Sequence, residues 1–419
     1  MNYKKIEKEN YNIHVIDSDR FKSTVVQVIF AKNFNSEDLA YDKILKSILV
    51  YSTKKYNTKS KMIKKIEDLY GINIMSSCSY TGNVGFNEFT LEFLNPRYTD
   101  EKTMRESIDM FMEVLFNPNI KDDAFDKDVL KLIKEQSITE CKNIVTNPRL
   151  YSSLEYNKIM YKGTPNEYSV YSTVEDIEKV SSKKLYKHYK KLFDGSYKID
   201  VIIHGLDGEQ LVKYIEKYFD NIKANKNKFN IFVNNKHNNK VIEKENTMPF
   251  NQSKIYLGYT VDNYSDEKDY YTFRVLNMIL GSMNNSILFD TVREKNSLCY
   301  NISSYINRYN PSLTIYSGIN KDNKEKAINI IKECVLSLKN KALIDTLLDA
   351  ARHNIETSLN SYYDDLIGQI NNVYMNEFAS VLDIESYRSK LLEVGSNDIV
   401  NLAKRLKLSV IYFMKGELE

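Results

Sequence analysis

Histidine and cysteine are scarce in this chain and are not spaced for shared chemistry. The five histidines lie far apart, and the run His353-Asn354-Ile355-Glu356-Thr357 has Thr where a second metal-binding His would be needed. We therefore expect His353 to lie on a helix surface. The four cysteines are Cys78, Cys141, Cys299 and Cys334. No two of them have the spacing of metal ligands. Their scatter predicts neither disulfides nor a zinc knuckle, but reduced thiols in a cytoplasmic protein.

A more informative stretch runs from Val275 to Tyr300 and reads VLNMILGSMNNSILFDTVREKNSLCY. It resembles the signature of the pitrilysin/insulinase family of zinc metallopeptidases: an apolar helix, a glycine turn, a short helix with Leu-Phe, then Arg-Glu-Lys, Leu and Tyr. The resemblance is to the smaller two-domain type, bacterial or similar to the mitochondrial processing peptidase. The layout of the rest of the chain agrees with it over nearly the whole length.

The resemblance implies that Arg293 and Tyr300 face the zinc across a cavity and hold the backbone of the substrate. Guanidinium and phenol groups suit this role, since both donate well to a carbonyl oxygen that develops negative charge. This chain departs from the family pattern at three positions, with Ser282 and Ser297 in place of glycines and Cys299 in place of alanine. The departures affect turn geometry and leave the Arg/Tyr pair intact.

The same resemblance places a zinc motif, His-x-x-Glu-His, on a helix in the first half of the chain. There the two His and a distant Glu bind Zn²⁺, and the Glu of the motif activates water. This chain instead has Lys43 and Lys46 at the first His and the Glu, and Ser47 at the second His. A protonated amine repels Zn²⁺ and offers it no lone pair. We expect no metal here, and we interpret Glu135, near the place of the distant Glu, as an exposed surface residue.

The sequence therefore indicates a non-catalytic subunit of a heterodimeric zinc metallopeptidase. Its partner would be a paralogous subunit with the zinc motif, and its substrate an unfolded peptide added as a strand at a sheet edge. An alternative is an inactive peptide-binding or scaffold protein of the same fold. A self-sufficient enzyme using other residues is disfavoured, because histidine is scarce and no Ser/His/Asp or Cys/His spacing is present.

An internal repeat organises the elements that must position these residues. The segment from Val180 has a Ser helix start, a helical pattern and the strand-like run 197–203. The segment from Val394 repeats this order, with a strand-like run at 408–413. Further matching pairs are the strands 24–30 and 254–260, the helices 41–51 and 270–280, the hairpins 72–93 and 300–317, the helices 104–116 and 324–338, and the long helical stretches 125–160 and 343–378.

The repeat predicts two homologous domains of the α+β class. Each should be a mostly antiparallel sheet packed with helices, and the pair should form a clamshell. We expect the N-terminal domain with the degenerate zinc motif at 1–222, a linker rich in Asn and Lys at 223–251, and the C-terminal domain with the Arg/Tyr motif at 252–419.

Composition excludes several other classes of protein. Lys and Arg number 59 against 56 acidic residues, a balance too even to favour nucleic acid as a partner. The densest basic stretch, 54–65, has the spacing of a solvated helix face. No apolar run is long enough to span a membrane, and the first residues do not have the pattern of a secretory signal.

Overall fold

The computed structural model describes residues 2–206, 208–219, 222–234, 240–380 and 383–417. These residues form two compact units, each of which takes one segment from the opposite half of the chain. Unit 1 consists of Met1–Ile144, Ser169–Ile231 and Asp364–Ser380. Unit 2 consists of Val145–Tyr168, Phe232–Tyr363 and Val381–Glu419.

Unit 1 is built on a six-stranded sheet in which β2 and β8 are parallel and the other neighbours are antiparallel. In spatial order the strands are β1 (Asn2–Glu7), β2 (Asn12–Asp17), β8 (Lys198–Gly205), β3 (Ser23–Asn33), β5 (Val84–Leu94) and β4 (Asn73–Thr81). A short hairpin joins β6 (Ile120–Lys121) to β7 (Ala124–Phe125). The helices are α1 (Leu39–Leu49), α2 (Lys59–Asp68), α3 (Glu101–Phe116), α4 (Lys127–Asn143), α6 (Val174–Lys179), α7 (Ser182–Lys191), α8 (Gly208–Ile215) and α12 (Leu366–Met375).

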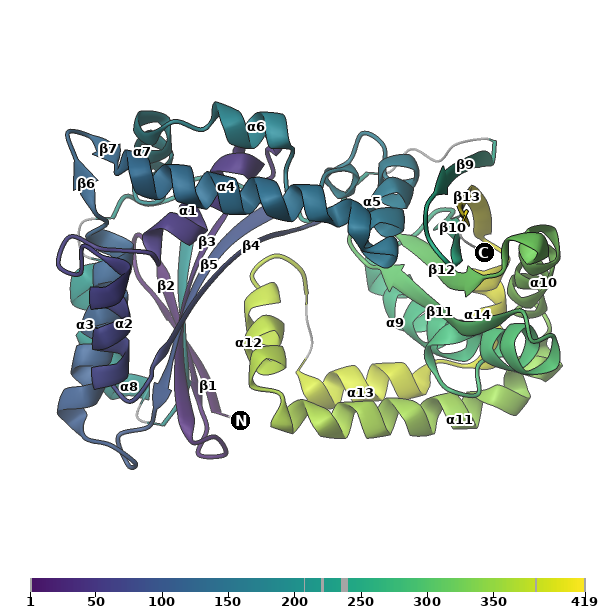
Figure 1. Cartoon of the computed structure of the whole chain (residues 1–419). Coiled ribbons are helices and arrows are strands. Elements are labelled where there is room, and N and C mark those ends of the chain that lie inside the picture. Colours follow the sequence, from purple (N-terminus) through teal and green to yellow (C-terminus); the bar gives the residue numbers. More distant parts are fainter. Residues whose placement is uncertain (1, 207, 220–221, 235–239, 381–382, 418–419) are drawn as a thin grey trace. The chain divides into compact units, whose positions relative to one another are not determined.

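Helices cover both faces of this sheet (Figure 1). One face shares a hydrophobic core with α1, α3 and α7, which includes Ile44, Phe111 and Leu185. The other face packs against α12, where the ring centroid of Tyr374 lies 5.9 Å from that of Phe86. The helix α12 comes from the second half of the chain and still completes the core of unit 1.

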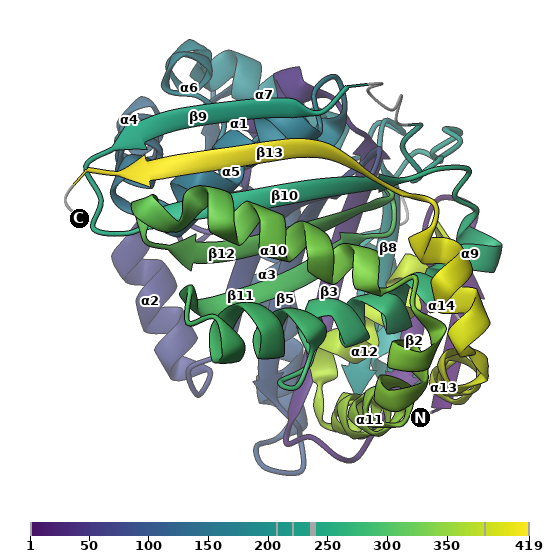
Figure 2. The same cartoon turned by 90° about the vertical axis from the view of Figure 1, so that its right-hand side faces the viewer.

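Unit 2 is built on a five-stranded sheet, and Figure 2 shows its strands next to one another. In spatial order the strands are β11 (Cys299–Asn307), β12 (Ser312–Ile319), β10 (Ser253–Val261), β13 (Leu406–Gly416) and β9 (Ile242–Met248). The helices are α5 (Pro148–Met160), α9 (Asp266–Asn277), α10 (Lys324–Ser337), α11 (Lys341–Asn360), α13 (Ile384–Glu393) and α14 (Ser396–Ala403), with two π-helical segments, η5 (Met278–Ser282) and η6 (Phe289–Lys295).

The central strand β10 is buried on both faces, and its side chains alternate between two cores. Ile255 and Leu257 join the core formed with α9, α10 and α14. Tyr256 faces α5, and its ring stacks on that of Tyr156 with the centroids 4.9 Å apart. Gly258 makes room for this contact, because a Cβ there would lie 2.3 Å from the hydroxyl of Tyr156.

The two sheets confirm the repeat and the α+β class expected from the sequence. β3 lies between β5 and β8 in unit 1, as β10 lies between β12 and β13 in unit 2, and all these pairs are antiparallel. β8 pairs in parallel with β2, as β13 does with β9. The range 223–251, expected to be a linker, thus contains β9, the counterpart of β2.

The two long helical stretches are interrupted where the chain passes between the units. α4 and α5 are separated at Pro148, and the preceding Asn147 has φ −105° and ψ 103°. This is the extended conformation that a residue before proline favours. α11 and α12 are separated at Asp365, whose side chain accepts from the N–H of Gly368 at 2.8 Å. After each break a new helix begins, and its N-terminus is capped by a side chain, that of Asn147 in α5 and that of Asp365 in α12.

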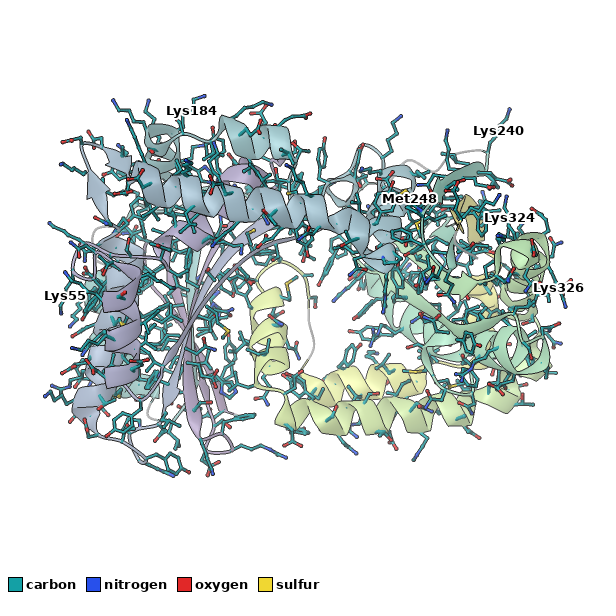
Figure 3. All side chains as sticks on the ribbon, in the orientation of Figure 1. Lys55, Lys184, Lys240, Met248, Lys324 and Lys326 are labelled. Atoms are coloured by element: carbon teal, nitrogen blue, oxygen red, sulfur yellow. The ribbon has the colours of Figure 1, made fainter. Side chains whose placement is uncertain are left out.

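Surface features agree with the composition. In α2 only Met62 is buried, and Lys55, just before this helix, is exposed (Figure 3). The lysine-rich stretch therefore forms the expected solvated face. Among the helices in the described part of the chain, none is long and apolar enough to cross a membrane.

Candidate functional site

Arg293 and Tyr300 line one surface pocket of unit 2, with a volume of about 580 Å³. Their neighbours in it are mainly amide side chains and backbone, from Asn251, Gln252, Gly318, Asn320 and Asn323. The exposed fraction of Tyr300 is 85%, and that of the Arg293 side chain is 43%. Both groups are therefore available to a molecule from outside, as a substrate contact requires.

Arg293 is held at the end of the π-helical segment η6. Its guanidinium lies 4.7 Å from the ring centroid of Phe289, and its Nε is 3.4 Å from Oε1 of Glu294. After it the N–H of Ser297 donates to the carbonyl of Arg293, and the N–H of Leu298 donates to that of Val292. These bonds close the helix and turn the chain into β11. π-helical segments are rare and frequently lie at functional sites.

Ser297, where the family pattern has glycine, adopts a backbone conformation that favours glycine. Its φ is 51°, in the left-handed region that L-residues with a Cβ adopt at a cost. The turn therefore has a left-handed residue at this position although that residue is not glycine. The other departure at a turn, Ser282, is exposed, whereas the neighbouring Gly281 is buried and a Cβ there would lie 2.6 Å from Leu288 and Ser304.

Tyr300 lies at the start of β11, which is the edge strand of the sheet of unit 2. The register between β11 and β12 shifts between Cys299 and Ile302, so Tyr300 sits in a bulge. Such irregularities re-aim a side chain at the edge of a sheet. Along the rest of β11 the backbone groups on the outer side pair with no described strand.

The pocket holds no activated nucleophile of its own. Burial raises the pKa of the Cys299 thiol, and the hydrogen bond with Ser317 and the charge of Arg293 lower it by less. The thiol is thus protonated at neutral pH. What the pocket offers chemically is hydrogen-bond donation from a guanidinium, a phenol and several amides.

The positions of the zinc motif lie on α1 in unit 1, where Lys43 and Ser47 have other partners. Nζ of Lys43 is 2.6 Å from Oε2 of Glu140 on α4 and 5.0 Å from the ring centroid of Tyr171. Ser47 donates its hydroxyl to the carbonyl of Lys43 at 3.3 Å. Lys46 is half-buried. These donors do not fit zinc, because two are ammonium groups and the third is already used within the helix.

Glu140 is the residue that the sequence analysis missed at this place. Glu135, considered for the distant metal ligand, is exposed as expected. It lies on the same helix as Glu140, five positions away, which is more than one turn. The spacing alone did not identify which carboxylate of α4 reaches α1.

A buried network anchors α1 through Asp42. Its carboxylate accepts from Nζ of Lys32 at 2.7 Å, from Nε2 of His188 at 2.7 Å and from the amide of Asn87 at 2.8 Å. Burial raises the pKa of Asp42, but Lys32 and His188 lower it by more, to about 2. Asp42 is therefore ionised and fixes the rotation of α1 against β3, β5 and α7.

A second buried cluster joins β2, β8 and the segment after α12. Ligand atoms of His14, Asp200 and Glu377 lie within 4.8 Å of one another. Both carboxylates already have cationic partners, since Lys198 pairs with each of them and Lys5 lies 2.8 Å from Glu377. The cluster is compensated in charge, so it does not require a metal ion, and it secures the α12 segment in unit 1.

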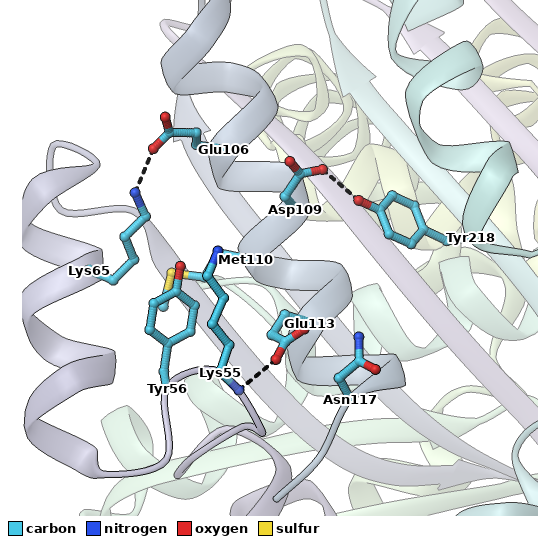
Figure 4. A pocket seen from close by; sticks show the side chains of 9 residues that line it. All are labelled: Lys55, Tyr56, Lys65, Glu106, Asp109, Met110, Glu113, Asn117 and Tyr218. Atoms are coloured by element: carbon cyan, nitrogen blue, oxygen red, sulfur yellow. Dashed lines mark hydrogen bonds and ion pairs between the residues drawn. The ribbon is translucent and has the colours of Figure 1, made fainter.

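Another pocket, of about 400 Å³, opens between α2 and α3 (Figure 4). Most of its charged groups have partners among the lining residues. Lys65 pairs with Glu106 at 2.5 Å, and Tyr218 donates to Asp109 at the same distance. The N–H of Lys55 donates to Glu113 at 2.9 Å. Because few of its polar groups are left for a ligand, this pocket is a weaker candidate than the one at Arg293.

Comparison with known proteins agrees with the motif and the fold. Residues 179–355 match the family model described as the peptidase M16 inactive domain. This segment, which is less than half of the chain, is similar to the M16 peptidase family. This is the pitrilysin/insulinase family that the Val275–Tyr300 stretch resembles, and the chain lacks its His-x-x-Glu-His motif.

Two curated relatives come from Bacillus subtilis. The chain is 24% identical to the "Probable inactive metalloprotease YmfF" over 408 residues, which is 96% of this chain and 95% of that protein. It is 23% identical to the "Uncharacterized zinc protease YmxG" over 296 residues, 70% of this chain and 65% of that one. The longer match thus extends across both homologous halves.

Solved structures share the fold over its full length. A conserved protein from Enterococcus faecalis superposes with a TM-score of 0.91 at 24% identity, covering all of both chains. A peptidase M16 inactive domain from Pseudomonas fluorescens gives a TM-score of 0.80 at 17% identity, with 99% of this chain and 98% of that one covered. At these identities the likeness concerns the fold.

Proposed function

We propose that this chain is the non-catalytic subunit of a heterodimeric zinc metallopeptidase. One observation carries the proposal. Arg293 and Tyr300 are exposed together in a pocket at an edge strand, while Lys43 and Ser47 occupy the zinc-motif positions of α1. A paralogous partner would supply the His-x-x-Glu-His motif, and this chain would supply contacts to the substrate.

In this proposal an unfolded peptide adds a strand to the outer side of β11. The main-chain groups of an edge strand give such a peptide affinity without requiring a particular sequence. Arg293 and Tyr300 then donate to the carbonyl of the bond that is cleaved, where negative charge develops in the transition state. The side chains act by orienting the peptide and by stabilising that charge.

Peptide binding without hydrolysis is the second candidate function. The name of the Bacillus relative, "Probable inactive metalloprotease", favours it, and so does the Lys43–Glu140 pair in place of metal ligands. Both candidates use the same edge strand and pocket. We propose a cytoplasmic location for either, on the ground that the four cysteines are free thiols.

Recovery of the partner tests the proposal. The tagged chain is purified from its native cells, and copurifying proteins are identified by mass spectrometry. We expect a chain of similar length with His-x-x-Glu-His, and we expect the mixture to cleave a quenched fluorescent peptide faster than that partner alone. Recovery of such a partner whose activity is unchanged by this chain would favour the scaffold function instead.

A further inference from the structure

A pocket of about 550 Å³ lies at the other end of β11, and we call it the Tyr/Arg pocket. Its wall on one side is α5, and its floor is formed by β10, β11 and β12. The lining side chains are chiefly aromatic and cationic, and those that the argument uses are Arg149, Tyr256, Tyr305, Arg308, Tyr309 and Tyr316. All of them belong to unit 2.

The pocket carries positive charge that the described residues do not neutralise. No Asp or Glu lines it. Arg308 donates to both oxygens of Asp266, at 2.8 and 2.7 Å, and is compensated. Arg149 is exposed, and its guanidinium lies 5.5 Å from the ring centroid of Tyr316. It forms no ion pair with any residue in the described part of the chain, so it is the charge available to a ligand.

Tyrosine side chains give the pocket a fixed shape and further donors. The hydroxyl of Tyr256 lies 3.0 Å from that of Ser152, which holds the ring in place. Tyr305 is 42% exposed at the rim. Burial raises the pKa of both phenols, so they stay protonated. The hydroxyl of Tyr256 is used within the wall of the pocket, where it donates to the carbonyl of Arg149 at 3.4 Å, and Tyr305 is the phenol that can donate to a ligand. A guanidinium on an aromatic ring, flanked by phenols, recognises a carboxylate well.

The register of the sheet connects the pocket to the edge of β11. Ser303, Tyr305 and Asn307 pair with Tyr316, Thr314 and Ser312. Since partners across a ladder point to the same face, these three side chains lie on the face covered by α5. Alternate side chains of a peptide added to β11 would point to that face as well. Tyr300 and Tyr305 are five positions apart along β11, a span of about 17 Å in an extended chain.

We infer that the Tyr/Arg pocket binds a carboxylate of an extended peptide docked along β11, about five residues from the bond held at Arg293 and Tyr300. The inference deepens the proposed function, on which it rests, by naming as the substrate class a peptide with a carboxylate at this position. The carboxylate comes from an Asp or Glu side chain or from the C-terminus of the peptide. Both sources present the same group to Arg149.

Peptide binding to the isolated chain tests the inference without the partner. Fluorescein-labelled peptides of about ten residues, enough to span β11, are compared by anisotropy. One carries a single Glu and an amidated C-terminus, one has Gln in its place, and a third has Gln and a free C-terminal carboxylate. We expect at least one carboxylate peptide to bind about fivefold tighter than the amidated Gln peptide, the ratio for one partly exposed charged hydrogen bond.

The substitution Arg149→Gln should remove that preference. Lys158→Gln is the matched control, because Lys158 is on the same helix, pairs with Glu155 and does not line the pocket. Preference for the Glu peptide assigns the carboxylate to a side chain, and preference for the free terminus assigns it to the chain end. Equal affinity for all three peptides, or a preference that Arg149→Gln leaves unchanged, overturns the inference. Failure of hydrolysis in the mixed subunits would leave this binding result intact.

Discussion

The ammonium of Lys43 lies 2.6 Å from the carboxylate of Glu140. The pair connects α1 and α4, the first of which carries the zinc-motif positions. The ammonium of Lys43 on α1 thus neutralises the carboxylate of Glu140 on α4. The side chain of Glu140 is 59% exposed, whereas that of Lys43 is 6% exposed. The glutamate thus faces solvent and covers the buried lysine.

The pair leads to a prediction about metal content. The chain purified in metal-free buffers should contain far less than one zinc per molecule, because Lys43, Lys46 and Ser47 offer no suitable ligands. Elemental analysis measures this. A variant with Lys43→His, Lys46→Glu and Ser47→His is the positive control and should take up zinc. One tightly held zinc per wild-type chain would contradict the prediction.

Asp42 should make the stability of unit 1 depend on acid pH. Its folded-state pKa of about 2 lies below the ordinary value of 3.8, so its contribution is present above about pH 4. It is lost as the pH falls toward 2. Asp42→Asn leaves Lys32 and His188 with Asp38 as their remaining carboxylate partner and should cost roughly 3 kcal/mol of unfolding free energy at pH 7.

Urea unfolding of wild type and Asp42→Asn at several pH values measures the effect. The gap between the two curves should close between about pH 4 and pH 2. Asp68→Asn, at an exposed position on α2, is the control and should follow the wild type. A gap that stays constant down to pH 2 would show that the charge of Asp42 has no part in it.

The packing of α5 in unit 2 predicts a large loss on truncation of Tyr156. This side chain is fully buried, and its hydroxyl lies 2.9 Å from that of Thr314. Tyr156→Ala should cost about 3–5 kcal/mol, and Tyr156→Phe about 1 kcal/mol. Gly258→Ala should also destabilise, since its Cβ would meet the hydroxyl of Tyr156. Thermal unfolding measures the stability of all three variants. Wild-type stability of Tyr156→Ala would contradict the packing of α5 against the sheet of unit 2.

At Ser297 we expect a substitution that stabilises the protein. Glycine at its φ of 51° relieves strain, so Ser297→Gly should raise the free energy of unfolding by roughly 0.5–1 kcal/mol. Asn296→Gly, at the preceding position with φ −108°, is the control and should not stabilise. A loss of stability in Ser297→Gly would mean that the turn needs the serine side chain.

Much of the fold could be predicted from the sequence because buried strands carry their own apolar signal. β3 and β10 are buried along nearly their whole length and were expected within a few residues. β9 was missed inside the expected linker, because its side chains are exposed or half-buried and its pairing depends on the backbone. The exchange of α5 and α12 was not predictable either, because a helical pattern shows an apolar face and not the sheet that covers it.

Some residues of the candidate site could be predicted from the sequence, and others could not. The resemblance of the Val275–Tyr300 stretch implied one site for Arg293 and Tyr300, and both residues line the same pocket. Their role stays a prediction. Glu140 and Asp42 were missed, because their partners are distant in the chain and only the packing of α1 brings them together. The Tyr/Arg pocket needed the register of β11 on β12, which no local pattern contains.

Cleavage by the reconstituted subunits, with Arg293→Ala and Tyr300→Phe in this chain, tests the central claim most directly. Each variant should assemble normally and lower turnover by ~10²–10³-fold, the usual cost of one lost donor to an oxyanion. Lys295→Gln and Tyr98→Phe are the controls, since both residues are exposed and lie outside the pocket. Size-exclusion chromatography monitors assembly. Variants of Arg293 and Tyr300 that assemble and cleave at the wild-type rate would contradict the account.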